Sequence, residues 1–195
     1  MNPGGTVGWA ERDRLRETSK FLSFVLRHRP DSIGLTLDAQ GWASIDALVA
    51  AANAHGHPLD AELLHQVVLG SDKQRFALSA DGSRIRANQG HSVEVDLGLP
   101  DTEPPELLYH GTATRFVASI RAQGLLPNER QHVHLSPTQL IAGEVGARHG
   151  KPLVLTVLAR QLHATGQPFY HSPNGVWLTR SVPSRFLMFP PDGEV

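Results

Sequence analysis

The chain has 195 residues, of which 40% are hydrophobic and 19% charged, and this composition suits one large or two small globular domains rather than a disordered chain. It contains no cysteine, which excludes disulfides, thiolate metal ligands and a cysteine nucleophile and fits a reducing cytoplasm. The formal net charge is −1, so a nucleic acid must be bound through a local basic site, and no apolar run approaches the ~18 residues that span a membrane.

The first half of the chain has the pattern of three helices followed by a β-hairpin. Apolar positions at helical spacing predict helices over residues 11–29, 45–54 and 61–69. Pro30 ends the first helix, and Ser44 and Asp60 are the expected N-caps of the other two. Hairpin strands are predicted over residues 75–79 and 84–87. This order of elements is typical of a winged-helix domain, which we expect to span residues 10–93.

An acidic, proline-bearing stretch over residues 94–106 marks the predicted linker between two domains. Beyond it, strands are predicted over residues 107–109, 133–135, 153–159, 176–179 and 186–189. Helices are predicted over residues 114–123 and 137–149, the second with Ser136 as its N-cap and Pro137 in its first position. Many short strands and few helices indicate an α+β fold for this second domain, residues 107–191.

Basic and polar residues gather in three short strings of the first half. Leu-Arg-His-Arg-Pro, residues 26–30, ends a helix, where cationic side chains are ordinarily found because they interact with the helix dipole. Arg75 belongs to Asp-Lys-Gln-Arg-Phe before the hairpin, which by itself reads as a charged turn. Arg84 and Arg86 alternate on a strand and share one face, and the string that follows at residues 88–92 is too polar for a core. That string indicates a loop or a ligand surface.

Two strings in the second half combine histidine with small or hydroxyl-bearing residues. Tyr-His-Gly-Thr, residues 109–112, follows a predicted strand, and its glycine would let the backbone approach a ligand closely. Arg-Gln-His-Val-His-Leu-Ser, residues 130–136, carries histidines on one face of a strand. His132 and His134 are also a possible metal pair, but no third ligand has suitable spacing, so we expect no metal site.

Taken together and in this order, the strings resemble the RNA 2′-phosphotransferase family, NAD-dependent enzymes that remove the 2′-phosphate left at a tRNA splice junction. The resemblance covers about residues 18–190, nearly the whole chain. The matching strings are S-K-F-L-S at 19–23, L-R-H at 26–28, D-K-Q-R-F at 72–76, I-R-A-N-Q-G-H-S at 85–92, Y-H-G-T at 109–112, R-Q-H-V-H-L-S at 130–136 and N-G-V-W at 174–177.

The resemblance implies a winged-helix lobe that binds the RNA phosphate and an ADP-ribosyltransferase-like lobe that binds NAD as co-substrate. The family's catalytic tetrad falls on Arg27, His28, Arg75 and Arg130. Its NAD site falls on His110, Gly111, Thr112, His134, Ser136, Asn174 and Gly175. No metal is implied, and the expected partner is 2′-phosphorylated RNA, tRNA-like or otherwise, without an obligate protein partner.

The reaction implied by the resemblance has two steps. The RNA 2′-phosphate is first ADP-ribosylated with loss of nicotinamide. Transesterification then releases 2′-hydroxyl RNA and ADP-ribose 1″,2″-cyclic phosphate. Where protein-modifying ADP-ribosyltransferases carry a glutamate, residues 175–177 are Gly-Val-Trp, which argues for a substrate that brings its own nucleophile.

Two other functions fit parts of the pattern. His-x-Thr at 110–112 and His-x-Ser at 134–136 match the paired signature of two-histidine phosphodiesterases, although a separation of 24 residues is short for that class. A winged-helix transcription factor would need a basic recognition helix, and the helix at 61–69 has no Lys or Arg. Release of nicotinamide from NAD only when 2′-phosphorylated RNA is present would separate the three functions.

Overall fold

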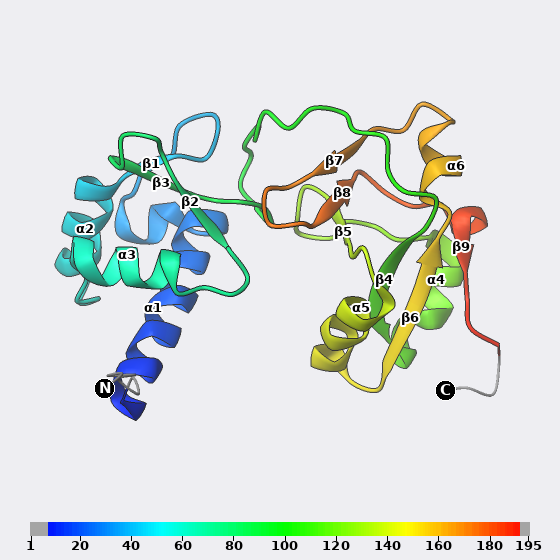
Figure 1. The fold of residues 1–195 in the computed structure, drawn as a ribbon, viewed down its shortest axis with the longest axis horizontal. Coiled ribbons are helices and arrows are strands. Elements are labelled where there is room, and N and C mark those ends of the chain that lie inside the picture. The colour runs from blue at the N-terminus through cyan, green and yellow to red at the C-terminus, as the bar shows by residue number, and fades with distance from the viewer. Residues whose placement is uncertain (1–7, 192–195) are drawn as a thin grey trace, which may run out of the picture. The chain divides into compact units, whose positions relative to one another are not determined.

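The computed structural model describes residues 8–191, and the chain divides into two compact units, Met1–Leu97 and Gly98–Val195 (Figure 1). The division falls inside the acidic stretch 94–106 that the sequence analysis singled out. Each unit has its own hydrophobic core, and the described residues form a mixed fold with six α-helices and three small antiparallel sheets. Within residues 8–191, no helix combines the length and the apolar character needed to cross a membrane.

The first unit contains three helices and one sheet. Its elements are α1 (Trp9–Arg27), the 3₁₀ helix η1 (Pro30–Ile33), β1 (Ala43–Ser44), α2 (Ile45–Ala54), α3 (Ala61–Leu69), β2 (Phe76–Leu78) and β3 (Arg84–Ala87). The predicted N-caps are confirmed: Ser44 Oγ accepts the Ala47 N–H at 3.4 Å, and Asp60 Oδ1 accepts the Leu63 N–H at 2.7 Å. These caps explain why the predicted bounds of α2 and α3 are correct.

Helix α1 ends two residues earlier than predicted, at Arg27. Pro30 disfavours helical backbone in the residue before it, and Arg29 accordingly has φ −139° and ψ 60°. His28 is left as the C-cap, with its N–H donating to the Phe24 carbonyl at 3.0 Å. The chain therefore turns sharply directly after Arg27 and His28.

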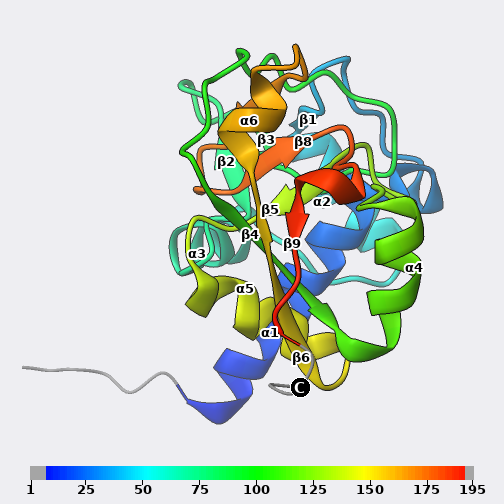
Figure 2. The ribbon, with the colours of Figure 1, turned by 90° about the vertical axis from the view of Figure 1, so that its right-hand side faces the viewer.

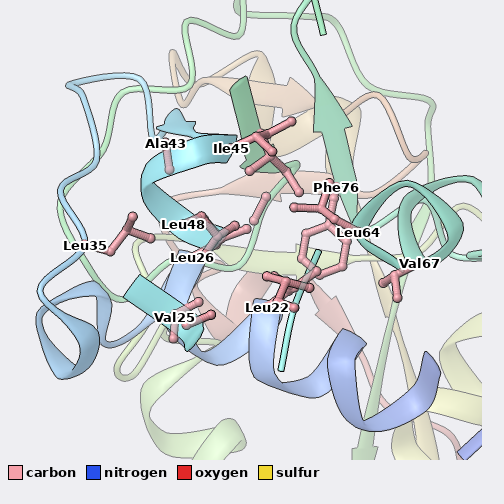
Figure 3. Close-up of a cluster of buried hydrophobic side chains, with 14 of the residues drawn as sticks. Leu22, Val25, Leu26, Leu35, Ala43, Ile45, Leu48, Leu64, Val67 and Phe76 are labelled. Carbon is pink, nitrogen blue, oxygen red and sulfur yellow. The ribbon is translucent and has the colours of Figure 1, made fainter. Parts of the chain in front are cut away.

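The core of the first unit anchors this end of α1. Leu22, Val25 and Leu26 project from one side of the helix and are fully buried (Figure 3). They belong to the same cluster as Ile85 on β3, the central strand of the β1-β3-β2 sheet. Each such side chain contributes about 1.5–3 kcal/mol when fully buried, so α1 is held firmly against the sheet.

The second unit consists of short strands with three helices. Its elements are β4 (Leu108–Ala113), η2 (Thr114–Phe116), α4 (Val117–Gln123), β5 (Val133–Leu135), α5 (Gln139–Gly146), η3 (Ala147–His149), β6 (Pro152–Val157), α6 (Ala159–His163), β7 (Phe169–His171), β8 (Trp177–Thr179), η4 (Ser184–Phe186) and β9 (Leu187–Met188). The strands form two antiparallel sheets, with orders β4-β6-β9 and β5-β8-β7. Tyr109 and Ser136 exchange backbone hydrogen bonds of 2.9 and 2.8 Å, which join β4 to the end of β5.

Helix α5 packs directly on the backbone of β4, beside β6 (Figure 2). A Cβ built on Gly111 of β4 would lie 1.7 Å from the Ala142 carbonyl oxygen, and one built on Gly146 would lie 2.6 Å from the Thr112 oxygen. The backbones of β4 and α5 can come this close only because both positions, Gly111 and Gly146, lack a Cβ. The sequence analysis expected Gly111 to admit a ligand, whereas in the structure helix α5 occupies the space beside its Cα.

Several predicted boundaries in the second unit are wrong. Helix α5 begins two residues later than expected, with Thr138 as its N-cap, because the Ser136 backbone is engaged with Tyr109. The buried strand predicted to reach residue 159 ends at Val157, and Ala159 begins the short helix α6. Strand β7 was not predicted, because its three residues give too short a pattern.

The end of the acidic stretch is integrated into the second unit. Asp101 Oδ1 accepts the Phe169 N–H at 3.0 Å, and the Thr102 N–H donates to the Phe169 carbonyl at 2.8 Å. Glu103 lies 3.2 Å from the Arg160 guanidinium. This part of the segment is therefore fixed along β7 rather than being a free tether.

Candidate active site

In the first unit the end of α1, the turn before β2 and the loop after β3 meet at Arg27. The Arg27 carbonyl accepts the N–H groups of Ser92 and Val93 at 2.9 and 3.3 Å, and its Nη2 donates to the Arg75 carbonyl at 3.5 Å. Gly90 has φ +90°, and a Cβ there would lie 3.6 Å from Arg27 Nη1. The loop thus wraps the guanidinium and brings Arg27 beside Arg75, 48 residues away in the chain.

His28 is oriented by the same loop. Its Nδ1 lies 3.0 Å from Ser92 Oγ, which is also 3.5 Å from the Arg27 carbonyl oxygen. Ser92 therefore contacts both predicted catalytic residues of α1. A fixed imidazole beside fixed guanidinium groups suits the binding of a phosphate, because charge-assisted hydrogen bonds depend on geometry.

The backbone at Arg75 is held by a buried amide. Asn88, which is 5% exposed, donates from Nδ2 to the Gln74 carbonyl at 2.6 Å and from its N–H to the Arg75 carbonyl at 2.9 Å. Gln74 has φ +39°, a left-handed conformation that is strained for a residue with a side chain. Asn88 stabilises this turn and so determines the direction in which Arg75 leaves the backbone.

Arg75 lines a depression of about 260 Å³. Arg16 and Lys73 also line it, together with one acidic side chain, Asp72. Because three basic side chains face one carboxylate, the depression is suited to an anion.

His91 lies behind this cluster and is 2% exposed. Burial, together with the positive charges of Arg27, His28 and Arg86, lowers its pKa to about 4. The ring is therefore neutral at physiological pH. The sequence analysis judged residues 88–92 too polar for a core, and this was wrong, since Asn88 and His91 are both buried.

Arg84 and Arg86 share one face of β3, as predicted. Their guanidinium carbons lie 5.5 and 4.6 Å from the centroid of the Trp42 ring. Both arginines thus stack on one aromatic side chain, an arrangement that stabilises this face of the sheet through cation–π contacts.

In the second unit, Arg130, His134 and His110 form a chain of contacts. Arg130 Nη1 lies 3.3 Å from His134 Nδ1, and His110 Nδ1 lies 3.1 Å from the His134 carbonyl oxygen. Because a guanidinium only donates, His134 Nδ1 accepts and its proton resides on Nε2. Because a carbonyl only accepts, His110 Nδ1 donates. Burial lowers the pKa of His110, so its Nε2 keeps a lone pair.

The remaining residues of the predicted NAD site lie on β4, β5 and a turn. Gly111 and Thr112 are buried under α5, and Ser136 is paired through its backbone with Tyr109. Asn174 accepts a hydrogen bond from Ser172 Oγ at 2.8 Å, and Gly175 has φ +79° in the turn that leads to β8. These two residues shape the turn between β7 and β8.

The predicted tetrad is divided between the units. Arg27, His28 and Arg75 come together in the first unit, while Arg130 lies in the second with the histidines. The supporting roles of Asn88, His91 and Ser92 were missed by sequence reasoning. Their polar character suggested exposure, and only the position of Gly90 among them hinted at a close backbone approach. Among residues 8–191, no three His, Asp or Glu side chains are grouped so as to hold a metal ion.

Comparison with known proteins decides the family. A sequence model described as RNA 2′-phosphotransferase, Tpt1 / KptA family, matches residues 13–181. The chain belongs to the RNA 2′-phosphotransferase family. The resemblance drawn from the seven strings is thereby confirmed, and the match runs through both units of the structure.

Individual members of the RNA 2′-phosphotransferase family resemble the chain over almost its full length. A probable RNA 2′-phosphotransferase of Agrobacterium fabrum is 60% identical over 177 residues, which cover 91% of this chain and 95% of the relative. Similarly named proteins of Acaryochloris marina and Streptomyces coelicolor are each 54% identical, over 90% and 92% of this chain and 97% and 98% of their own.

Proposed function

We propose that the chain is an NAD-dependent RNA 2′-phosphotransferase that transfers an internal RNA 2′-phosphate to NAD. The products are 2′-hydroxyl RNA, nicotinamide and ADP-ribose 1″,2″-cyclic phosphate. The observation that carries the proposal is the cluster of Arg27, His28 and Arg75, fixed by the loop at residues 88–92 in a member of this family. The substrate is a tRNA-like or other 2′-phosphorylated RNA. We propose a cytoplasmic location, with which the cysteine-free composition is compatible.

The first unit is proposed to be the winged-helix lobe that binds the RNA phosphate. Its element order, α1-β1-α2-α3-β2-β3, and its sheet order, β1-β3-β2, support this assignment. In this lobe the phosphate-binding residues come from α1 and from the turn before β2. The helix at 61–69 carries no Lys or Arg, which supports binding of a phosphate rather than reading of duplex DNA.

The charge of the substrate explains the choice of residues. A phosphate monoester carries about −1.5 to −2 charges near neutral pH and is itself a nucleophile. The first step therefore requires orientation rather than a general base. Guanidinium and imidazole groups each supply a charge-assisted hydrogen bond, worth roughly 1.5–3 kcal/mol. The second step concentrates negative charge on the phosphoryl oxygens, where fixed cations lower the barrier.

The second unit is proposed to be the ADP-ribosyltransferase-like lobe that holds NAD. When bound, NAD supplies a ribose carbon that accepts the phosphate and nicotinamide as the leaving group. His110 offers an Nε2 acceptor, which fits a ribose hydroxyl because a hydroxyl can donate a hydrogen bond. Arg130 fixes the proton position of His134.

The proposal is tested with purified protein, NAD and an oligonucleotide carrying one internal 2′-phosphate. We expect nicotinamide release and loss of the 2′-phosphate in equal amounts. The matched oligonucleotide with a 2′-hydroxyl should release no nicotinamide, and the phosphorylated one should be unchanged without NAD. Nicotinamide release that does not depend on the RNA phosphate would contradict the proposal.

A further inference from the structure

The first unit contains a cavity of about 750 Å³ that the proposed reaction does not use. It is lined by the face of α1 that carries Phe21 and Phe24, by η1, and by the loop at residues 55–59. Its volume falls within the roughly 300–1,000 Å³ of typical ligand pockets. We call it the Phe24 pocket.

Aromatic rings dominate one side of the Phe24 pocket. Phe21 stacks on His57 with 4.1 Å between ring centroids and 22° between ring planes. Phe24 is 47% exposed although its neighbours Leu22 and Val25 are fully buried. An exposed phenyl ring beside a stacked pair provides a surface for another flat ring.

The same pocket carries positive charge at its rim. Arg14 and Lys20 line it together with a single carboxylate, Glu17. Lys20 Nζ lies 2.9 Å from Glu17 Oε1, and both side chains are more than 60% exposed. An exposed ion pair of this kind is weak, so Lys20 can leave the Glu17 carboxylate and bind a phosphodiester with little loss of free energy.

The Phe24 pocket adjoins the proposed phosphate site. The His28 N–H donates to the Phe24 carbonyl, so Phe24 precedes His28 by one helical turn, or about 6 Å along the axis. His28 is the C-cap rather than a helical residue, so this backbone hydrogen bond is what places it next to Phe24. An RNA whose 2′-phosphate is held at His28 can therefore bring a neighbouring nucleotide to the Phe24 ring.

We infer that the Phe24 pocket binds the unpaired base of a nucleotide next to the 2′-phosphate, by stacking on Phe24 and by contact of Lys20 and Arg14 with the RNA backbone. The inference rests on the proposed function and adds to it a subsite for one unpaired base of the RNA. Every base can stack on an aromatic ring, so we expect the pocket to bind RNAs long enough to reach it, whatever their base sequence.

The test uses a series of short 2′-phosphorylated RNAs, each with one abasic position. In the unchanged enzyme, loss of the base at one flanking position should raise KM about fivefold to tenfold, with kcat changed less than twofold, as expected for loss of one stacked base. In Phe24→Ala, KM for the intact RNA should rise by the same factor, and the abasic penalty at that position should disappear. Leu69→Ala is the matched control, because Leu69 is exposed on α3 and is absent from the linings of both described cavities.

A binding measurement supplies an independent readout. 2-Aminopurine at the same position should lose fluorescence on binding to the unchanged enzyme and Leu69→Ala in the absence of NAD, and should keep it with Phe24→Ala. Lys20→Gln should weaken RNA binding and reduce its salt dependence. An enzyme that tolerates every abasic position, or a penalty that persists in Phe24→Ala, would overturn the inference. Failure of the unchanged enzyme to remove any 2′-phosphate would instead overturn the proposed function.

Discussion

Arg75 is held differently from the other two residues of its cluster, Arg27 and His28. Its backbone is fixed by Asn88 after a strained turn, and its side chain lines a depression with Lys73. Arg27 and His28 are held side by side at the end of α1 and can orient the phosphate for the first step. The second step needs additional stabilisation of a more highly charged phosphoryl group.

We expect Arg75→Ala to slow the second step more than the first. Loss of one charge-stabilising group costs about 3–4 kcal/mol in the transition state, or a factor of about 10²–10³. RNA carrying ADP-ribose on its 2′-phosphate should then accumulate, whereas Arg27→Ala should slow both steps. A time course with radiolabelled RNA resolves substrate, intermediate and product. Loss of activity without an intermediate would show that the division of labour is wrong.

His91 should make the stability of the protein depend on pH. Its pKa is about 4 in the folded protein and ordinarily 6.5, so the unfolded chain takes up the proton first as pH falls. The stability that depends on neutral His91 is complete above pH 6.5 and is lost toward pH 4, by an amount on the order of 3 kcal/mol. Urea unfolding between pH 7 and 4.5 measures this change.

The variant that tests this prediction is His91→Gln, because the glutamine side chain does not titrate. We expect it to be less stable than the unchanged protein at pH 7 and to lose less stability on acidification. Equal slopes for the two proteins would show that His91 is not the titrating group.

At the scale of elements, the closest backbone approach at any described glycine is the one between β4 and α5. A methyl group at Gly111 would overlap the Ala142 carbonyl and force the helix away from the strand. We expect Gly111→Ala to lower the free energy of unfolding by about 3 kcal/mol, at the upper end of overpacking costs. Thermal unfolding followed by circular dichroism measures the loss.

Gly143→Ala is the control for this contact. Gly143 lies in the same helix, but a Cβ there would meet only Val154 Cγ2, at 3.9 Å. Replacement of a helical glycine by alanine without a clash stabilises by about 0.5–1 kcal/mol. The two substitutions should therefore change the melting temperature in opposite directions. A stable Gly111→Ala protein would mean that α5 does not need its close approach to β4.

At the scale of the whole molecule, the proposed chemistry depends on guanidinium groups in both units and on no metal ion. Arg27 and Arg75 lie in the first unit and Arg130 in the second. Fixed cations supply the stabilisation that a divalent ion provides in many phosphoryl transfers. We expect the activity to persist in EDTA, with nicotinamide release as the measurement. Activity lost in EDTA and restored by zinc or magnesium would contradict this prediction.

The sequence by itself determined the family and the local structure that depends on neighbouring residues. The order of the seven strings was sufficient to identify the family, and Ser44 and Asp60 located the starts of α2 and α3, because an N-cap acts within one helical turn. Short strands such as β7 were missed, because three residues carry too little periodic pattern.

Tertiary structure alone decided which of the singled-out residues are buried and what they contact. Asn88 and His91 are polar, yet they are buried because the loop that carries them closes over Arg27 and the turn at Arg75, far away in the sequence. Gly111 faces α5, and His134 is oriented by Arg130. Burial and hydrogen bonding depend on the segments that pack together, and those partners are set by the folded chain rather than by the local sequence pattern.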